Sequence, residues 1–417
     1  MTLNLMLGLS PLIIPLWSTG FLLTGPHLWW QALLWVLPMG LPVLADYAGW
    51  RGGPPVHAPP RYLASAVIGA VAGLFVIDLG LLLEMSTRWR WSLEAGLENT
   101  LSDLLAVKFL LGSHGAHSSL LTGHELIHRR SRVANSLGRL LLALSCYHHF
   151  SIEHLHGHHR RVGREEDPAT ARFGETYEAF FRRSVTGQFK SAWKLESQRV
   201  HRRPAARFPW LGNKVLRGMI FESCWLVSIL WIFGPAALLA YAVQTFMAIR
   251  NLEAINYVQH WGLVRNNRPP GAADAWRTDT WCSTHMLLGM AHHARHHQEP
   301  ARPYFRLRPL AGSPKLPHGY FALMFLIAYR NERFQALATA ELGRLGLGPF
   351  SRHGHAHDQI HSQRQPGPQQ GIGKLVADVV DGFDPGRQGS DHGGVGHRRA
   401  MVTEQAAAQR RAHQQRR

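Results

Sequence analysis

The feature that most limits how this chain can fold is a set of apolar runs about as long as a lipid bilayer is thick. A helix needs about 20 mainly apolar residues to cross a membrane. Runs of this kind occupy residues 3–24, 28–46, 62–86, 99–122, 218–233 and 236–257. Because the hydrocarbon core offers no water to backbone N–H and C=O groups, each run must be helical there. The sequence thus predicts an all-α integral membrane bundle of about six transmembrane helices.

Positive charge is concentrated between the apolar runs. The formal net charge is +18, and Arg and Lys are dense in residues 129–217. Cytoplasmic loops of membrane proteins carry such an excess. We therefore expect the N-terminus, residues 129–217 and everything after the sixth run to lie on the cytoplasmic side of a bacterial-type inner (plasma) membrane. Because this topology accounts for the basic charge, no nucleic acid partner is predicted.

Regions of different composition follow one another along the chain. The predicted organisation is transmembrane helices 1–4 in 1–122, a cytoplasmic histidine-rich segment in 123–217, transmembrane helices 5 and 6 in 218–257, a cytoplasmic segment that completes a metal site in 258–350 and a disordered tail in 351–417. The tail is rich in His, Gln and Arg, which is typical of a solvated extension. The first run lacks the charged start and Ala-x-Ala site of a cleaved signal peptide, so we expect it to be retained as a span.

Nine histidines show a spacing that a metal site would explain. The pairs four residues apart are His124 and His128, His154 and His158, and His293 and His297, and His159, His260 and His296 join them as single members. Residues four apart lie on the same face of a helix. A single histidine is most often packed or solvated. Three such pairs on one predicted side of the membrane favour a metal site shared by all four segments.

The number of histidines bears on the identity of the metal. A zinc ion is satisfied by four ligands, so nine imidazoles exceed what one zinc takes up. Imidazole also suits iron and copper, and two non-haem irons sharing nine histidines fit the count. Many imidazoles around iron in a membrane protein indicate oxygen chemistry. The side chains expected to orient the ligands are Glu125, Glu153, Asp167, Asn256 and Gln259.

Two functions of other classes are open from these residues alone. His124-Glu125-x-x-His128 matches the signature of zinc metalloproteases, in which Glu125 would be the general base. The other seven histidines, however, have no role in that mechanism. A metal or haem carrier with paired histidines would hold its ligands at mid-membrane, whereas these histidines lie beyond the ends of the apolar runs.

Four segments resemble the motifs of a known family. They are residues 123–129 (GHELIHR), 149–159 (HFSIEHLHGHH), 256–263 (NYVQHWGL) and 293–297 (HARHH). They are similar to the motifs of the membrane-bound alkane 1-monooxygenases and the related xylene monooxygenase hydroxylase subunits, within the fatty acid desaturase–hydroxylase superfamily. The resemblance covers roughly residues 1–345. It implies that all nine histidines named above are iron ligands.

The resemblance also implies an activity. Such an enzyme hydroxylates the terminal carbon of an alkane or related alkyl group with O2 and two electrons. The electrons would come from a separate rubredoxin or ferredoxin and its reductase, because the three cysteines form no Cys-x-x-Cys pair. A hydrophobic small molecule would enter from the membrane lipid between the spans.

Two positions depart from the alkane enzymes. Gln259 stands where they usually have Glu and where the xylene type has Gln, and Arg295 stands where they have Asp. A xylene-type methyl hydroxylase is therefore an alternative. A lipid desaturase of the same superfamily is another, although desaturases usually have shorter histidine motifs and lack the Asn-Tyr-x-x-His segment at 256–260.

Overall fold

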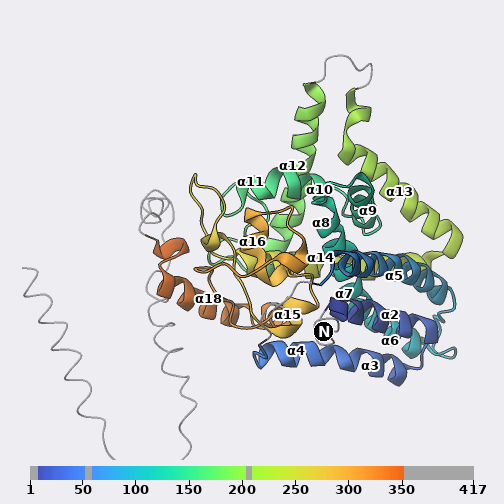
Figure 1. Ribbon diagram of the computed structural model, residues 1–417. Coiled ribbons are helices and arrows are strands. Elements are labelled where there is room, and N and C mark those ends of the chain that lie inside the picture. The colour runs from blue at the N-terminus through green and yellow to red at the C-terminus, as the bar shows by residue number, and fades with distance from the viewer. Residues whose placement is uncertain (1–7, 52–58, 203–208, 352–417) are drawn as a thin grey trace, which may run out of the picture. The chain divides into compact units, whose positions relative to one another are not determined.

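Helices joined by loops make up the described part of the computed structural model, which comprises residues 8–51, 59–202 and 209–351 (Figure 1). Within these ranges the only strand-like pairings are two isolated β-bridges, Arg51 with Thr280 and Arg277 with Lys315. The all-α prediction is confirmed for this part of the chain. The described residues belong to one unit, Met1–Pro366, whereas nearly all of the predicted tail lies outside them. The predicted division into membrane and cytoplasmic segments stays a prediction.

Each of the six apolar runs forms helices over the residues that the structure describes. They form η1 (Ser10–Leu12) with α2 (Ile13–Thr24); α3 (Trp29–Val36), η2 (Leu37–Met39) and α4 (Gly40–Tyr47); α5 (Arg61–Thr87); the series from α6 (Leu97–Ala106) to α8 (Thr122–Ile127); α13 (Lys214–Phe233); and α14 (Pro235–His260). Among the described helices, only α5 and α13 are long and apolar enough to cross a membrane by length and composition. The bundle of six spans therefore stays a prediction.

Further helices lie between and after these runs. They comprise α9 (Arg132–Ala143), α10 (Phe150–Glu153), α11 (His159–Arg161), α12 (Tyr177–His201), η6 (Pro209–Gly212), η7 (Ala272–Asp274), α15 (Trp281–His285), η8 (Met290–His292), α16 (His293–Gln298), η9 (Tyr304–Arg306), α17 (Tyr320–Tyr329), α18 (Asn331–Leu345) and η10 (Gly348–Phe350). Side-chain oxygens of Ser131, Thr176 and Asn213 accept hydrogen bonds from the first turns of α9, α12 and α13. These caps fix where the three helices begin.

Helix α14 is the central element, and it packs against α5, α12, α13, α17 and α7 (Gly112–Gly115). Figure 1 shows α2, α3, α5 and α6 on one side of it, with α8, α10 and α11 on the other. Small residues allow the closest approach: a Cβ added to Gly115 would lie 3.0 Å from Cβ of Ala248. The last residue of α14 is His260, so this packing places a predicted ligand at the end of a rigid helix.

The helical series from Leu97 to Ile127 is interrupted twice by π-helix. The π segments are η3 (Val107–Leu111) and η4 (Ala116–Leu121), and a third, η5 (His154–His158), lies between α10 and α11. A π segment inserts an extra residue into a turn, and such insertions are frequent at functional sites. Here they precede or contain predicted ligands.

Asp78 shows how a charged group is accommodated within an apolar run. Thr19 Oγ1 donates to Asp78 Oδ1 at 2.8 Å, and His114 Nε2 lies 3.1 Å from Asp78 Oδ2. All of these groups are at least partly buried. The carboxylate thus joins α2, α5 and α7 as a polar contact between helices.

Candidate metal centre

The nine predicted histidines converge in two adjacent groups. Group one contains His124, His128, His154, His159 and His296, and group two contains His158, His260, His293 and His297. Within each group the potential ligand atoms all lie within 4.8 Å of one another. The groups adjoin, since the ring centroids of His159 and His297 are 4.7 Å apart. Four segments, whose outermost histidines His124 and His297 are 173 positions apart in the chain (297 − 124 = 173), therefore meet at one place.

Helix ends supply most of these side chains. In group one, His124 belongs to α8, His128 is the C-cap of that helix, and His159 begins α11. In group two, His260 ends α14 and His293 begins α16. Because α8 and α14 both pack in the helical core, their ends place imidazoles with little freedom to move.

The π segment η5 divides the second histidine motif between the two groups. On an α-helix, His154 and His158 would share a face. The π segment instead places His154 with His159, five positions on, and their ring centroids are 4.5 Å apart. This follows from the i→i+5 hydrogen bonds of a π-helix. His158 then faces group two. The i, i+4 spacing of His154 and His158 therefore does not place both side chains in the same group.

The spacing between imidazole nitrogens fits metal coordination. Neighbouring Nε2 atoms are 3.0–3.1 Å apart in five pairs, three in group one and two in group two. A metal ion about 2.1 Å from each nitrogen would hold two ligands at right angles about 3.0 Å apart. The donor atoms are thus arranged as they would be around an ion in each group.

Burial keeps eight of the nine imidazoles neutral, as metal ligands must be. It lowers the pKa of His124 and of His260 to about 3. The same cause, together with the neighbouring histidines, lowers the pKa of six others well below the usual value: His128, His154, His159, His293, His296 and His297. A neutral imidazole has one nitrogen lone pair available for a metal.

Two oxygen atoms orient rings of group two. Asp167 Oδ2 lies 2.8 Å from His158 Nδ1, and the carbonyl of Asp274 lies 3.1 Å from His260 Nδ1. Burial raises the pKa of Asp167, but His158 and a hydrogen bond from Thr170 outweigh burial, and the net pKa is lowered. An ionised Asp167 holds the proton of His158 on Nδ1 and leaves Nε2 free for a metal. The prediction that Asp167 orients a ligand is supported by this contact.

Replacing Asp167 by alanine should weaken metal binding in group two more than in group one. Loss of a carboxylate that orients a ligand typically costs about 10–100-fold in metal affinity. We expect the D167A protein to retain close to half of the wild-type metal content after dialysis, as measured by elemental analysis. Asp167→Asn is the matched control, because its amide oxygen can still accept from His158 Nδ1. Equal losses from D167A and D167N would contradict this role.

The other four proposed orienting residues contact different groups. Glu125 accepts from the Arg129 guanidinium and from the backbone N–H of Tyr304, and Glu153 accepts from Arg161. Asn256 donates to Glu253. Among the described hydrogen bonds, none joins these side chains or Gln259 to the nine imidazoles. These side chains therefore stabilise the segments that carry the ligands. The Glu125 carboxylate is occupied by hydrogen bonds from Arg129 and Tyr304, which does not suit a general base.

Gln259 and Arg295, which depart from the motifs of the alkane enzymes, both bind nearby side chains or backbone groups. Gln259 Nε2 donates to the carbonyl of Met290 at 3.2 Å and lies 3.0 Å from Tyr320 Oη. A carboxylate could not donate to that carbonyl unless it were protonated, so an amide suits this position. Arg295 pairs with Glu299 at 3.0 Å, one helical turn further on.

Glu253 is a structural residue that sequence reasoning missed. It is fully buried and accepts from Tyr147 at 3.0 Å, Ser184 at 2.7 Å and Gln188 at 2.9 Å, with Asn256 at 3.3 Å. This network joins α12, α14 and the segment before α10. The signal was a Glu within an apolar run, seven positions before His260, where two helical turns bring it back to the same face.

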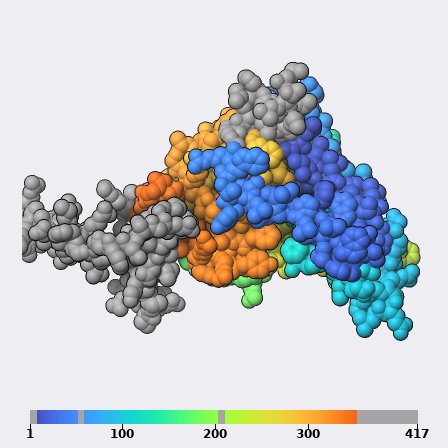
Figure 2. Space-filling model, turned by 90° about the horizontal axis from the view of Figure 1, so that it is seen from below, coloured from blue at the N-terminus to red at the C-terminus, as the bar shows by residue number. Residues whose placement is uncertain are grey.

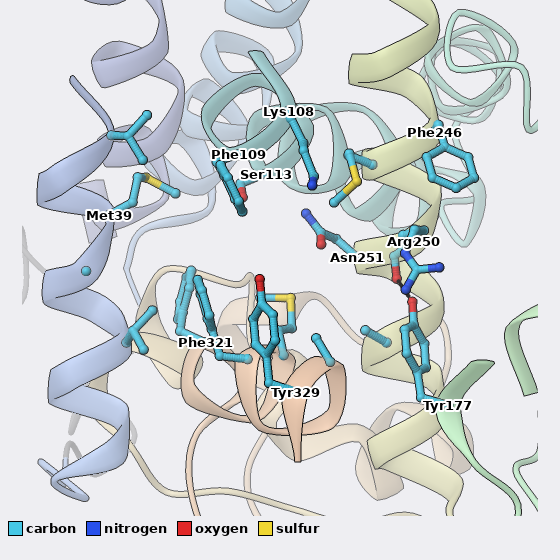
Figure 3. Close-up of a pocket in the computed structure, with 18 of the residues that line it drawn as sticks. Met39, Lys108, Phe109, Ser113, Tyr177, Phe246, Arg250, Asn251, Phe321 and Tyr329 are labelled. Atoms are coloured by element: carbon cyan, nitrogen blue, oxygen red, sulfur yellow. Dashed lines mark hydrogen bonds between the residues drawn. The ribbon is translucent and has the colours of Figure 1, made fainter. Parts of the chain in front are cut away.

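A cavity of about 630 Å³ opens between α3, α4, α14 and α17. Figure 2, seen from below, shows α3 and α4 (blue) beside α17 (orange) on this face. The close-up in Figure 3 shows the aromatic rings of Phe109, Phe246 and Phe321 around it. Most of the lining is apolar, as in sites that bind hydrophobic ligands.

A narrower cavity of about 30 Å³ continues from the first. Both are lined by Ser113, Asn251, Phe321 and Met324. The narrow cavity is further lined by residues that directly precede the ligand segments: Leu121, Ile255 and Met290. The two cavities therefore lead in series toward the histidine groups.

Comparison with known sequences assigns the chain to a protein family. The family described as fatty acid desaturase matches residues 103–326, which is more than half of the chain. That range contains all nine histidines of the two groups.

Individual relatives within this family are alkane and xylene/toluene monooxygenases. Alkane 1-monooxygenase 1 of Alcanivorax borkumensis is 37% identical over 226 residues, or 52% of this chain and 55% of the relative. Alkane 1-monooxygenase 2 of Pseudomonas aeruginosa is 30% identical over 275 residues, or 64% of this chain and 70% of the relative. The xylene/toluene monooxygenase hydroxylase component of Pseudomonas putida is 28% identical over 203 residues, or 48% of this chain and 54% of the relative. The chain thus spans about half the length of several of these relatives.

Proposed function

The chain belongs to the fatty acid desaturase family and, within it, to the alkane 1-monooxygenases, and from this premise we propose that it is a membrane-bound non-haem di-iron monooxygenase. It hydroxylates the terminal carbon of alkanes or related alkyl groups. The observation that carries the proposal is the pair of adjacent groups of buried, neutral histidines. Five imidazoles and four imidazoles suit two irons, one in each group.

The reaction class follows from this metal set. Two bound irons would supply O2 activation, in which one oxygen atom enters a C–H bond and the other leaves as water with two electrons and two protons. The chain's own part is to position the ligands and to exclude water. Every histidine of the two groups except His128 and His159 is buried, and those two are half-buried.

The two cavities provide the path for a hydrophobic substrate. The wider cavity is partly open and lined mainly by apolar side chains, so it suits entry of a molecule dissolved in lipid. The narrow cavity lies between it and the ligand segments. We propose that a slender alkyl chain enters this constriction end-on, which would present its terminal carbon first.

Membrane insertion and electron supply complete the proposal. Helices α5 and α13 fit membrane insertion, and we place the chain in an inner (plasma) membrane with its N-terminus and metal centre on the cytoplasmic side. Electrons come from a separate rubredoxin or ferredoxin and its reductase. An acidic donor of this kind would be attracted to a basic surface.

A second candidate substrate class is the methyl group of an alkylated aromatic ring. The observation that favours it is Gln259, whose amide donates to Met290 and which the xylene type shares. A zinc metalloprotease is disfavoured, because Glu125 is engaged with Arg129 and Tyr304.

One experiment tests the proposed function. The full chain in isolated membranes, supplied with a rubredoxin or ferredoxin and its reductase, is given a homologous series of alkanes, with toluene and xylene for comparison. We expect terminal alcohols and about two irons per chain by elemental analysis. About one zinc and no iron per chain, together with peptidase activity, would overturn the proposal.

A further inference from the structure

Arg265 is a buried arginine in the loop that follows α14. It is only 4% exposed, and among the described residues no carboxylate pairs with it. Its described side-chain hydrogen bonds all go to backbone carbonyls: to Val162 at 2.6 Å, to Arg160 at 2.8 Å and to Arg268. A buried charge is costly unless it is hydrogen-bonded, so these carbonyls are what stabilises the guanidinium here.

Two of the three carbonyls belong to the segment that carries the second histidine motif. Arg160 lies in α11, and Val162 is the C-cap of that helix. His158 and His159 directly precede Arg160 in the chain. Arginine side chains commonly bond the last carbonyls of a helix, and here the arginine comes from a segment 103 positions away.

The backbone reinforces this connection. The N–H of Arg265 donates to the carbonyl of Gly163 at 2.6 Å, and the N–H of Gly163 donates to Thr170 Oγ1 at 2.9 Å. Gly163 has a φ of +76°, and a Cβ there would lie 2.8 Å from Cβ of Arg265, so the two segments approach closely because this residue is glycine. Thr170 in turn donates to Asp167, which orients His158.

The third carbonyl leads to His260. The Arg268 carbonyl accepts from Arg265, and the Arg268 guanidinium forms two hydrogen bonds of 2.7 Å with the carboxylate of Asp274. The carbonyl of Asp274 lies 3.1 Å from His260 Nδ1. Arg265 therefore connects the residues that orient His158 with those that orient His260.

One histidine group depends on this connection more than the other. Group two takes His158 from η5 and His260 from the end of α14, whereas group one takes no ligand from α14 or from the loop after it. The ring centroids of His158 and His260 are 5.1 Å apart. Loss of the connection would therefore displace two ligands of group two relative to each other.

We propose that Arg265 is a positioning residue of the metal centre, which fixes the end of α11 against the loop after α14 so that His158 and His260 meet around one metal ion. The inference rests on the proposed function and deepens it, because it assigns the geometry of group two to a residue outside the nine histidines. A planar guanidinium presents several donors in a fixed arrangement, and an ammonium does not.

The test measures metal content and spectrum, so that it does not depend on turnover. Purified full chains in detergent are loaded anaerobically with isotopically enriched ferrous iron, dialysed against a chelator, and measured by elemental analysis and Mössbauer spectroscopy. We expect Arg265→Met to retain about half of the wild-type iron, because the metal affinity of group two falls by about tenfold or more. Arg265→Lys should retain an intermediate amount, because an ammonium can bind some of the carbonyls but not all three.

Two ligand variants identify the iron that remains. His260→Ala removes a ligand of group two, and His124→Ala removes a ligand of group one. The Mössbauer spectrum of the Arg265→Met protein should match that of the His260→Ala protein and differ from that of the His124→Ala protein. A general loss of stability would not produce this match.

The matched control is Arg199→Met. Arg199 also donates to a backbone carbonyl, that of Gly212, and it pairs with Glu196 on α12, which carries no histidine of either group. The Arg199→Met protein should keep the iron content and the spectrum of the wild type.

Three results would overturn the proposal. The first is wild-type iron content and spectrum in the Arg265→Met protein. The second is an equal loss of iron from both groups that follows a fall in melting temperature, since Arg265 would then act through overall stability. If the Arg265→Met protein does not fold, the third is a wild-type iron content and spectrum in the Arg265→Lys protein.

Turnover separates this inference from the proposed function. A wild-type protein that oxidises alkanes, with an unchanged spectrum in Arg265→Met, refutes the positioning role alone. A wild-type protein that binds metal in both groups but oxidises no alkane, with selective loss from group two in Arg265→Met, refutes the monooxygenase and leaves the positioning role.

Discussion

Replacing His158 by alanine is expected to reduce hydroxylation by more than about 100-fold, because it removes a ligand rather than a group that merely orients one. His158 is buried, its Nδ1 is held by Asp167 at 2.8 Å, and its ring faces His260 and His297. The H158A protein also removes the imidazole beside the buried Asp167, which keeps the hydrogen bond from Thr170. The measurements are alcohol formation from an alkane and iron content per chain. Membrane insertion should persist, since His158 lies outside the predicted spans.

The matched control for this prediction is in the same π segment. His156 is exposed and belongs to neither histidine group, so His156→Ala should keep activity within about twofold of the wild type. Full activity and full iron content in the H158A protein would refute the assignment of His158 as a ligand.

Replacing Glu253 by alanine is expected to destabilise the fold by about 3 kcal/mol, since each buried donor left without an acceptor costs about 1–3 kcal/mol. The Tyr147 hydroxyl and the Gln188 amide both donate to this fully buried carboxyl group. Thermal unfolding in detergent should show a loss of several degrees. Activity should fall with it, because the network connects α12 to the helix that ends at His260.

Two further variants serve as comparisons for the stability of the E253A protein. Glu253→Gln keeps one acceptor oxygen and should lose less stability than the E253A protein. Glu332→Ala removes an exposed carboxylate from α18 and should change the free energy of unfolding by less than about 0.5 kcal/mol. Unchanged melting of the E253A protein would mean that its donors find other partners.

Sequence reasoning was most successful where one residue type repeats with a regular period. Six of the nine histidines were named as pairs from their spacing, and all nine lie in the two groups. The apolar runs were named from length and composition, and every one forms helices over the residues that the structure describes. Both signals are local, so a single chain shows them without knowledge of its tertiary contacts.

Features that depend on tertiary packing could not be read in this way. The division of His154 and His158 between groups depends on the π segment, whose hydrogen bonding no residue pattern specifies. The wider cavity exists only because α3, α4, α14 and α17 meet. Of the five proposed orienting residues, only Asp167 forms a described side-chain hydrogen bond with a histidine of either group, because proximity in sequence does not fix where a side chain points.

The π segment η5 has a consequence for how this chain can change. Neighbouring residues of one backbone turn belong to different histidine groups, so the segment has a required length as well as a required composition. Inserting a single residue after Leu155 would rotate every later side chain by about 100° and turn both His158 and His159 away from their sites. Substitutions between the histidines are therefore open to evolution and to engineering, whereas insertions there are not.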